Sequence, residues 1–258
     1  MSTILFASPV FGPVRSRRLG VSLGINLLPA GGKVCTFDCI YCECGFNSDH
    51  RAHSPMPTRE EVREALEAKL KEMARAGELP DVLTFAGNGE PTVHKDFAAI
   101  VDDVLALRSL YCPQARVAVL SNATQIYNPR VREALMKVDD NILKLDTVSP
   151  DYIARTCRPV GRYDVAKQVE EMAAFGGRAI VQTMFMTGQW QGVSVDNTGP
   201  ELVDPWIEAV VRIGPQKVMI YTIDRETPAE GLRKASREQL DGIAERLRAR
   251  GIEVDVAY

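Results

Sequence analysis

The chain has 258 residues, of which 45% are hydrophobic and 25% are charged, the composition of an ordinary soluble globular protein. Its formal net charge of −3 gives no support for a nucleic-acid partner, although a local basic patch is compatible with that count. No apolar run approaches the roughly 20 residues that span a bilayer, so no membrane segment is expected. The first residues lack a basic segment and are interrupted by Pro9 and Pro13, which argues against a secretion signal. We therefore expect a cytoplasmic protein.

The cysteines are unevenly distributed. Six are too few for a disulfide scaffold in a chain of this length, and a reducing compartment would keep them as thiols. Four of them fall within Cys35–Cys44, whereas Cys112 and Cys157 stand alone. Such clustering in a cytoplasmic protein indicates metal or redox chemistry.

Short apolar runs alternate with longer amphipathic segments along most of the chain. Runs rich in β-branched and apolar residues predict strands that are buried on both faces. The predicted strands are Gly20–Leu27, Asp81–Ala86, Arg116–Ser121, Asn141–Leu145, Ala179–Met184, Lys217–Tyr221 and Glu253–Val256.

The segments between these strands carry apolar residues at helical spacing. The first of them begins with Thr58, and Glu61 follows three residues later, which is the pattern of a capping box. The predicted helices are Thr58–Ala76, Lys95–Leu110, Pro129–Lys137, Tyr163–Phe175, Glu201–Ile213 and Ser236–Arg250.

Alternation of strands and helices at this spacing indicates a parallel sheet. The pattern contains six βα units and a short strand after the last helix. We predict an α/β fold in which parallel strands form a partial (β/α)6 TIM-like barrel, because a closed eight-stranded barrel usually needs roughly 250 residues or more. No linker or repeat divides the chain, so residues 1–258 are expected to form one domain. Its core is expected at about residues 20–225, followed by a C-terminal helix and strand at about residues 236–257.

Three cysteines follow the first predicted strand with the spacing C-x3-C-x2-C: Cys35, Cys39 and Cys42. Ligands of parallel barrels bind at the carboxyl ends of the strands, which is where this loop begins. Three thiolates on one short loop can bind three irons of a cubane cluster and leave the fourth iron open to a substrate. The alternatives are chance clustering, a zinc site, or an electron-transfer cluster completed by Cys44. Zinc sites prefer two C-x2-C pairs, and Cys44 lies only two residues after Cys42, a tight fit for another corner of the same cubane.

Polar residues also follow the next two predicted strands. The segment Gly87-Asn88-Gly89-Glu90 ends the second strand, and its glycines let the backbone approach a ligand that the carboxylate of Glu90 could bind. The other interpretation is a plain βα turn in which glycine supplies a positive φ. Ser121-Asn122 ends the third strand, where it either contacts a ligand or caps a turn.

Two further polar residues are expected to point toward the barrel mouth. Asp146 follows the fourth predicted strand, and Gln182 lies within the fifth. A polar side chain inside an otherwise apolar barrel needs a partner, which is either a ligand or an internal hydrogen bond.

An arginine-rich run precedes the first strand. Arg15, Arg17 and Arg18 are candidates for contacting a substrate, because guanidinium groups suit carboxylate or phosphate. The other interpretation is a solvated basic turn.

The cysteine loop, with Tyr41 directly before its third cysteine, resembles the radical S-adenosylmethionine (SAM) superfamily. The resemblance implies that the three cysteines hold a [4Fe–4S] cluster whose open iron binds the amino and carboxylate groups of SAM. It also implies that one electron from the cluster cleaves SAM to a 5′-deoxyadenosyl radical, which abstracts a hydrogen atom. A reducing partner of the flavodoxin or ferredoxin type is then expected.

The same resemblance assigns the cofactor contacts. It implies that the backbone near Tyr41 contacts the adenine and that Asn88-Gly89-Glu90 holds the methionyl amino group, with Asn88 in place of a glycine. It further implies that Ser121 and Asn122 reach the ribose or the carboxylate.

The segment Ala86–Thr92, with the sequence AGNGEPT, and the arginine run resemble one branch of the superfamily. That branch is related to the wybutosine-pathway tRNA enzyme that forms imidazoguanosine. The resemblance to that enzyme includes no second cluster, because no cysteine precedes Cys35. We predict a radical SAM enzyme of oxidoreductase or lyase type with a small-molecule or peptidyl substrate. The alternatives are radical modification of tRNA, which the net charge does not favour, and an electron-transfer or metal-binding protein.

Overall fold

The computed structural model of the chain describes residues 3–16 and 20–258. In chain order its elements are β1 (Val10–Ser16), β2 (Gly20–Ile25), α1 (Arg59–Ala76), β3 (Val82–Phe85), the 3₁₀ helix η1 (Pro91–Val93), α2 (Phe97–Tyr111), β4 (Arg116–Ser121), α3 (Pro129–Leu135), β5 (Asp140–Lys144), α4 (Pro150–Thr156), α5 (Val165–Ala173), β6 (Ala179–Met184), β7 (Met186–Trp190), β8 (Val193–Ser194), α6 (Pro200–Ile213), β9 (Lys217–Tyr221), β10 (Leu232–Lys234), α7 (Arg237–Arg248) and β11 (Val254–Ala257).

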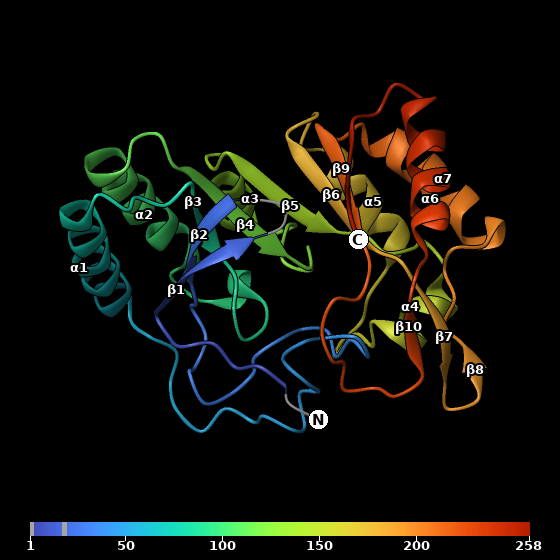
Figure 1. Ribbon diagram of the computed structural model, residues 1–258, viewed down its shortest axis with the longest axis horizontal. Helices are drawn as coiled ribbons and strands as arrows, with labels where there is room; N and C mark the ends of the chain where they lie inside the picture. Colours follow the sequence, from blue (N-terminus) through green and yellow to red (C-terminus); the bar gives the residue numbers. More distant parts are fainter. Residues whose placement is uncertain (1–2, 17–19) are drawn as a thin grey trace.

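Eight strands form one curled sheet in the order β1-β2-β3-β4-β5-β6-β9-β11. Every pair from β2 to β11 is parallel, whereas β1 runs antiparallel to β2 at one edge. Helices lie along the outside of the curled sheet, which forms an open half-barrel (Figure 1). The predicted partial (β/α)6 barrel is confirmed.

The barrel has an inner and an outer core. The residues that face its interior form a small apolar cluster, which comprises Val82, Ala118, Ile142, Ile180 and Met219. The opposite faces of the same strands pack against the helices in a larger cluster, where Phe85 meets Phe97 edge to face. Burial of both faces explains why these strands appear in the sequence as nearly continuous apolar runs.

The first predicted helix shows how local sequence sets an element boundary. The Thr58 side chain accepts a hydrogen bond from the Glu61 amide, and the Glu61 side chain accepts one from the Thr58 amide, so the predicted capping box is present. The helix ends at Gly77, which adopts a left-handed φ of 72° that costs glycine little.

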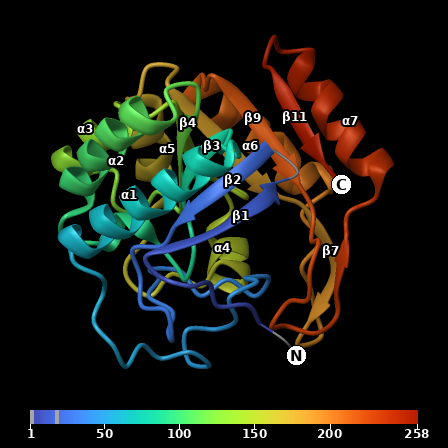
Figure 2. The same cartoon turned by 60° about the vertical axis from the view of Figure 1, so that its left-hand side comes forward.

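The carboxyl ends of the parallel strands meet at one end of the barrel, which we call the mouth. The long segment between β2 and α1 lies at this end, beside the small antiparallel sheet β10-β7-β8 (Figures 1 and 2). Among the described helices, none is both long and apolar enough to cross a membrane.

Several elements of the structure were not predicted from the sequence. Strand β1 contains Gly12 and Pro13, so the segment resembles a turn. Helix α4 has only seven residues, and β7, β8 and β10 form a partly exposed sheet without a long apolar run. Short or half-exposed elements of this kind carry little periodic signal.

Candidate functional site

The cysteine loop is attached at its first end to the glycine-rich turn that follows β3. The Val34 amide donates to the Asn88 carbonyl at 2.9 Å, and the Glu90 amide donates to the Val34 carbonyl at 3.0 Å, as in a short parallel bridge. Gly89 makes this approach feasible, because a Cβ there would lie 1.9 Å from the Val34 carbonyl oxygen and its φ is 133°. The predicted glycine-rich turn therefore packs directly against the loop.

A second attachment joins the middle of the loop to the end of α4. The Asp38 amide donates to the Cys157 carbonyl at 3.0 Å, and the Ile40 amide donates to the Thr156 carbonyl at 2.9 Å. The Asp38 carboxylate also forms an ion pair with Arg158 at 3.2 Å. The Arg158 side chain is therefore held by the cysteine loop.

The third attachment runs from Tyr41 to Asp146, two residues after the end of β5. The Tyr41 hydroxyl donates to the Asp146 carboxylate, which also accepts from the Met184 amide at 3.0 Å. Burial, together with the Asp146 charge, raises the pKa of Tyr41 well above its usual value. Tyr41 and Asp146, both predicted cofactor residues, are therefore in direct contact.

The three predicted ligand thiols have distinct neighbours. Cys35 Sγ lies 3.6 Å from Asn122 Nδ2, the Cys44 thiol donates to Cys42, and the Cys39 thiol donates to Cys157. Burial and the nearby Glu90 charge raise the pKa of Cys35 to about 12. The hydrogen bond from Cys44 lowers the pKa of Cys42 below its usual value.

The loop thiols do not converge on one point. No three Cys, His, Asp or Glu side chains within residues 3–16 and 20–258 form a site for a single metal ion. A cubane does not need that convergence, because each iron takes its own thiolate and the three thiolates lie at different corners.

A buried cation accompanies the thiols. The Lys33 residue is 5% exposed, and its Nζ donates to the Gly45 carbonyl at 2.6 Å and to Cys42. Its nearest carboxylate oxygen, on Asp38, is 4.0 Å away. Burial alone lowers the pKa of Lys33, but the neighbouring sulfurs of the loop outweigh it and the pKa lies above its usual value.

Glu90, Ser121 and Asn122 form one hydrogen-bonded group. The Glu90 carboxylate, 2% exposed, accepts from the Ser121 hydroxyl at 2.8 Å and from the Asn122 amide at 2.6 Å. The Asn122 side chain in turn donates to Thr36 at 2.8 Å. Burial raises the pKa of Glu90. The structure therefore brings together the predicted residues of β3, β4 and the cysteine loop.

A second polar group surrounds Asp146. Lys144, on β5, forms an ion pair with the Asp146 carboxylate and donates to Cys157 Sγ at 3.3 Å. The ammonium also lies 5.4 Å from the centre of the Tyr41 ring. Burial alone lowers the pKa of Lys144, but the Asp146 charge and the nearby thiols raise it well above its usual value. Lys144 and Cys157 were not among the predicted site residues.

Gln182 faces the barrel interior beside this group. It pairs with Lys144 across β5 and β6 and with Met219 on the other side. Its Nε2 is buried and has no hydrogen-bond partner in the part of the chain that the structure describes. A buried amide without a partner is rare in folded proteins and indicates a place for a ligand or water.

The remaining predicted residues are less close to the site. The Asn88 side chain is fully buried and bonds the Phe6 and Pro29 backbones, so it fixes the N-terminal segment. Arg15 pairs with Val21, near the amino end of β2 and away from the mouth. This placement argues against contact between Arg15 and a ligand at the cysteine loop. Arg17 and Arg18 lie outside the described residues.

The residues at the mouth fit an iron–sulfur cluster and SAM. Three thiols share one anchored loop, and Lys33 supplies positive charge beside them, which suits a cluster whose thiolates make it anionic. The unpartnered amide of Gln182 and the carboxylate of Asp146 offer polar contacts to a zwitterionic ligand.

The family model described as the radical SAM superfamily matches residues 31–190, more than half of the chain. The chain belongs to the radical SAM superfamily. A [4Fe–4S] cluster and SAM are accordingly its cofactors. The match includes the cysteine loop and continues through β7.

Several curated proteins are similar to this radical SAM chain. A protein named GTPase Obg from Brachyspira hyodysenteriae is 30% identical over 251 residues, which are 96% of this chain and 35% of that protein. UPF0026 proteins from Helicobacter pylori J99 and Synechocystis are 29% and 32% identical. The matches cover 84% and 86% of this chain and 66% and 77% of those proteins. The chain thus spans less than two thirds of the first two.

Solved radical SAM structures share the fold. A radical SAM methyltransferase from Sphaerobacter thermophilus matches with a TM-score of 0.66 at 16% identity, over 91% of this chain and 65% of that chain. TYW1 with a lysine–pyruvate adduct matches with a TM-score of 0.61 at 14% identity, over 88% and 73%. At these identities the likeness concerns the fold.

Proposed function

We propose that this chain cleaves SAM reductively at a [4Fe–4S] cluster held by Cys35, Cys39 and Cys42. We further propose that it abstracts hydrogen from a small-molecule or peptidyl substrate. The observation that carries the proposal is the double connection of the cysteine loop. One side reaches Glu90 and Asn122 through hydrogen bonds at Cys35 and Thr36, and the other reaches Asp146 through Tyr41.

The cluster supplies the electron that breaks the sulfonium C–S bond of SAM, which gives methionine and a 5′-deoxyadenosyl radical. The residues of this chain would bind and orient the cofactor. Hydrogen bonds from Ser121 and Asn122 hold the buried carboxylate of Glu90 in place, so it is preorganised for an ammonium group. Gln182 would donate its free amide to an oxygen of the cofactor.

The fold is shared by a radical SAM methyltransferase and by TYW1, and a Selenomonas ruminantium protein of similar sequence is named S-adenosylmethionine-dependent nucleotide dehydratase. This variety of reactions on one fold means that the loops of the mouth select the substrate. A flavodoxin or ferredoxin is the proposed source of electrons. tRNA gains no support from Arg15, which lies away from the mouth.

Anaerobic reconstitution tests the proposal. The wild-type chain should bind about four irons and four sulfides. With dithionite it should convert SAM to 5′-deoxyadenosine, quantified by chromatography. Cys39→Ala should lose both the fourfold iron content and the product. Cys112→Ala is the matched control, because Cys112 is buried at the end of α2 and is not part of the cysteine loop. This variant should retain both the iron content and the product.

Electron paramagnetic resonance separates this function from simple electron transfer. SAM should change the spectrum of the reduced cluster if one iron is open to it. The chain could instead bind a full cluster whose spectrum does not change when SAM is added, and form no 5′-deoxyadenosine. That result would favour an electron-transfer protein in which Cys44 completes the coordination.

A further inference from the structure

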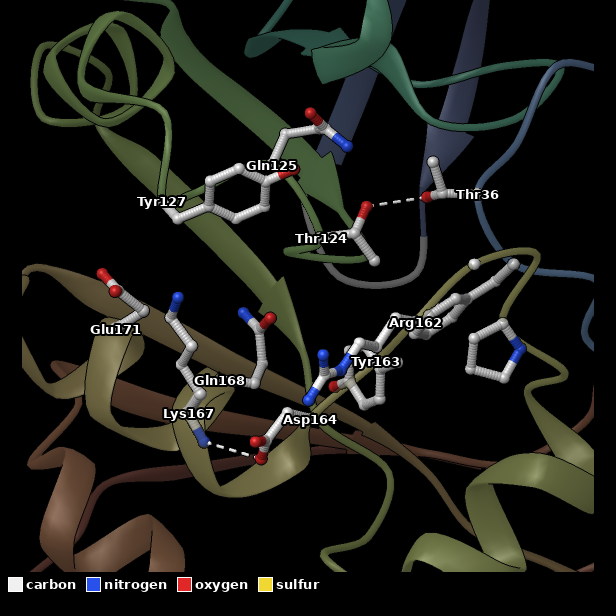
Figure 3. A pocket seen from close by; sticks show the side chains of 13 residues that line it. Thr36, Thr124, Gln125, Tyr127, Arg162, Tyr163, Asp164, Lys167, Gln168 and Glu171 are labelled. Atoms are coloured by element: carbon white, nitrogen blue, oxygen red, sulfur yellow. Dashed lines mark hydrogen bonds between the residues drawn. The ribbon is translucent and has the colours of Figure 1, made fainter.

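A pocket of about 590 Å³ lies beside the cysteine loop, and its volume is within the range of small-molecule sites. Three segments line it: Thr36 and Phe37 of the loop, residues 124–127 after β4, and residues 159–171, which lead into α5. We call it the α5 pocket. Figure 3 shows side chains from these segments around one opening.

Two cations, Arg162 and Lys167, line the α5 pocket. Arg162 and Lys167 are both exposed, and neither side chain has a hydrogen bond or an ion pair with the residues that the structure describes. The carboxylates nearby are already engaged. Asp164 accepts from the amides of Ala166 and Lys167 at the start of α5, and Glu171 forms an ion pair with Arg132. The pocket therefore offers two positive charges to an anion.

The pocket also has aromatic walls. Tyr127 is 58% exposed. Phe37 and Tyr163 also line the pocket, and their rings meet edge to face with their centres 5.2 Å apart. An exposed ring beside cations suits a ligand that combines a planar group with negative charge.

The α5 pocket adjoins the cofactor site through two residues. Thr36 directly follows Cys35 and accepts from Asn122, which also contacts Cys35 Sγ. Phe37 forms a pocket wall, and the Lys144 ammonium lies 5.5 Å from its ring centre. One loop thus carries both a predicted cluster ligand and a wall of the pocket.

We propose that the α5 pocket binds the substrate of this protein and that the substrate joins a planar ring to a phosphate. Arg162 and Lys167 bind the phosphate, and Tyr127 stacks on the ring. The role as substrate pocket rests on the proposed radical function, whereas binding itself does not.

Cytidine 5′-monophosphate is a suitable probe, because it carries ring and phosphate but lacks the adenine of SAM. Calorimetric titration of the reconstituted chain at low salt should detect its binding. Arg162→Gln and Lys167→Gln should each weaken binding about tenfold, as expected for loss of one charge-assisted contact. Arg63→Gln, which changes an exposed arginine of α1, is the control and should leave it unchanged.

Four results would overturn the proposal. The first two are that the wild-type chain does not bind the probe, or that Arg162→Gln and Lys167→Gln bind it as tightly as the wild type does. The other two are that cytidine, or inorganic phosphate, binds the wild-type chain as tightly as the probe does. Equal binding of cytidine would remove the phosphate requirement, and equal binding of phosphate would remove the ring. The spectral response of the reduced wild-type cluster to SAM is recorded in parallel. Its absence would count against the proposed function and leave the measured binding of the probe intact.

Discussion

The ion pair between Lys144 and Asp146 should determine the stability of the barrel mouth. The Asp146 side chain is 2% exposed and that of Lys144 is 15% exposed, so neither charge is well hydrated. Asp146→Asn keeps the shape but leaves the ammonium without its counter-charge. Removal of one partner from a buried pair typically costs about 3–5 kcal/mol, and we expect a loss of that size in the free energy of unfolding.

Urea unfolding of the cluster-free chain under reducing conditions, followed by circular dichroism, measures this loss. The double variant Lys144→Met/Asp146→Asn should recover most of it, because no isolated charge then remains in the barrel. A loss below about 1 kcal/mol for Asp146→Asn would refute the reasoning. So would a double variant whose loss equals the sum of the two single losses, since the residues would then act independently.

Three further predictions concern charge and capping. Lys33→Gln should lower the midpoint potential of the cluster, because a nearby positive charge favours the reduced form. A tenfold change in that equilibrium is about 59 mV for one electron, and an unchanged potential in a spectroelectrochemical titration would contradict it. Asp103, whose pKa is held below its usual value by the hydrogen bond from Arg59, should contribute stability above the usual Asp pKa and lose it as pH falls through the lower folded value. Urea titrations at several pH values should therefore show a weaker acid dependence for Asp103→Asn. Thr58→Ala should remove one capping bond of α1 and cost about 1 kcal/mol, whereas an unchanged urea midpoint would show that the cap is dispensable.

Much of the fold was predictable because the barrel strands are buried on both faces. β6 and β9 have the predicted bounds, and β11 extends the parallel sheet beside β9 as the last predicted strand suggested. Strand β1 was not predictable in the same way, because Gly12 and Pro13 interrupt its pattern and it covers only one edge. The antiparallel sheet at the mouth is half-exposed and contains no long apolar run, so its strands could not be predicted from the hydrophobic pattern.

The site was predictable where the residues follow strands. Glu90 and Asn122 follow neighbouring strands, so parallel topology predicts that they lie at the same end of the sheet, and they are hydrogen-bonded. The interior position of Lys144 was also accessible, since it lies two residues before Asp146 on an alternating strand. Cys157 was not placed, because its proximity to Cys39 depends on α4, which was not among the predicted helices.

The attachments of the cysteine loop explain why that short helix matters. Val34 binds the turn after β3, Ile40 binds α4 and Tyr41 binds Asp146. The backbone around all three cysteines is therefore held without help from the cluster. Ordering one residue of a free loop costs about 1–2 kcal/mol in conformational entropy. A loop that is already ordered leaves more of the binding free energy available to the cluster itself. Helix α4 supplies the anchor between the first and third cysteines, so under the proposed function it helps to hold the three thiols in position for the cluster.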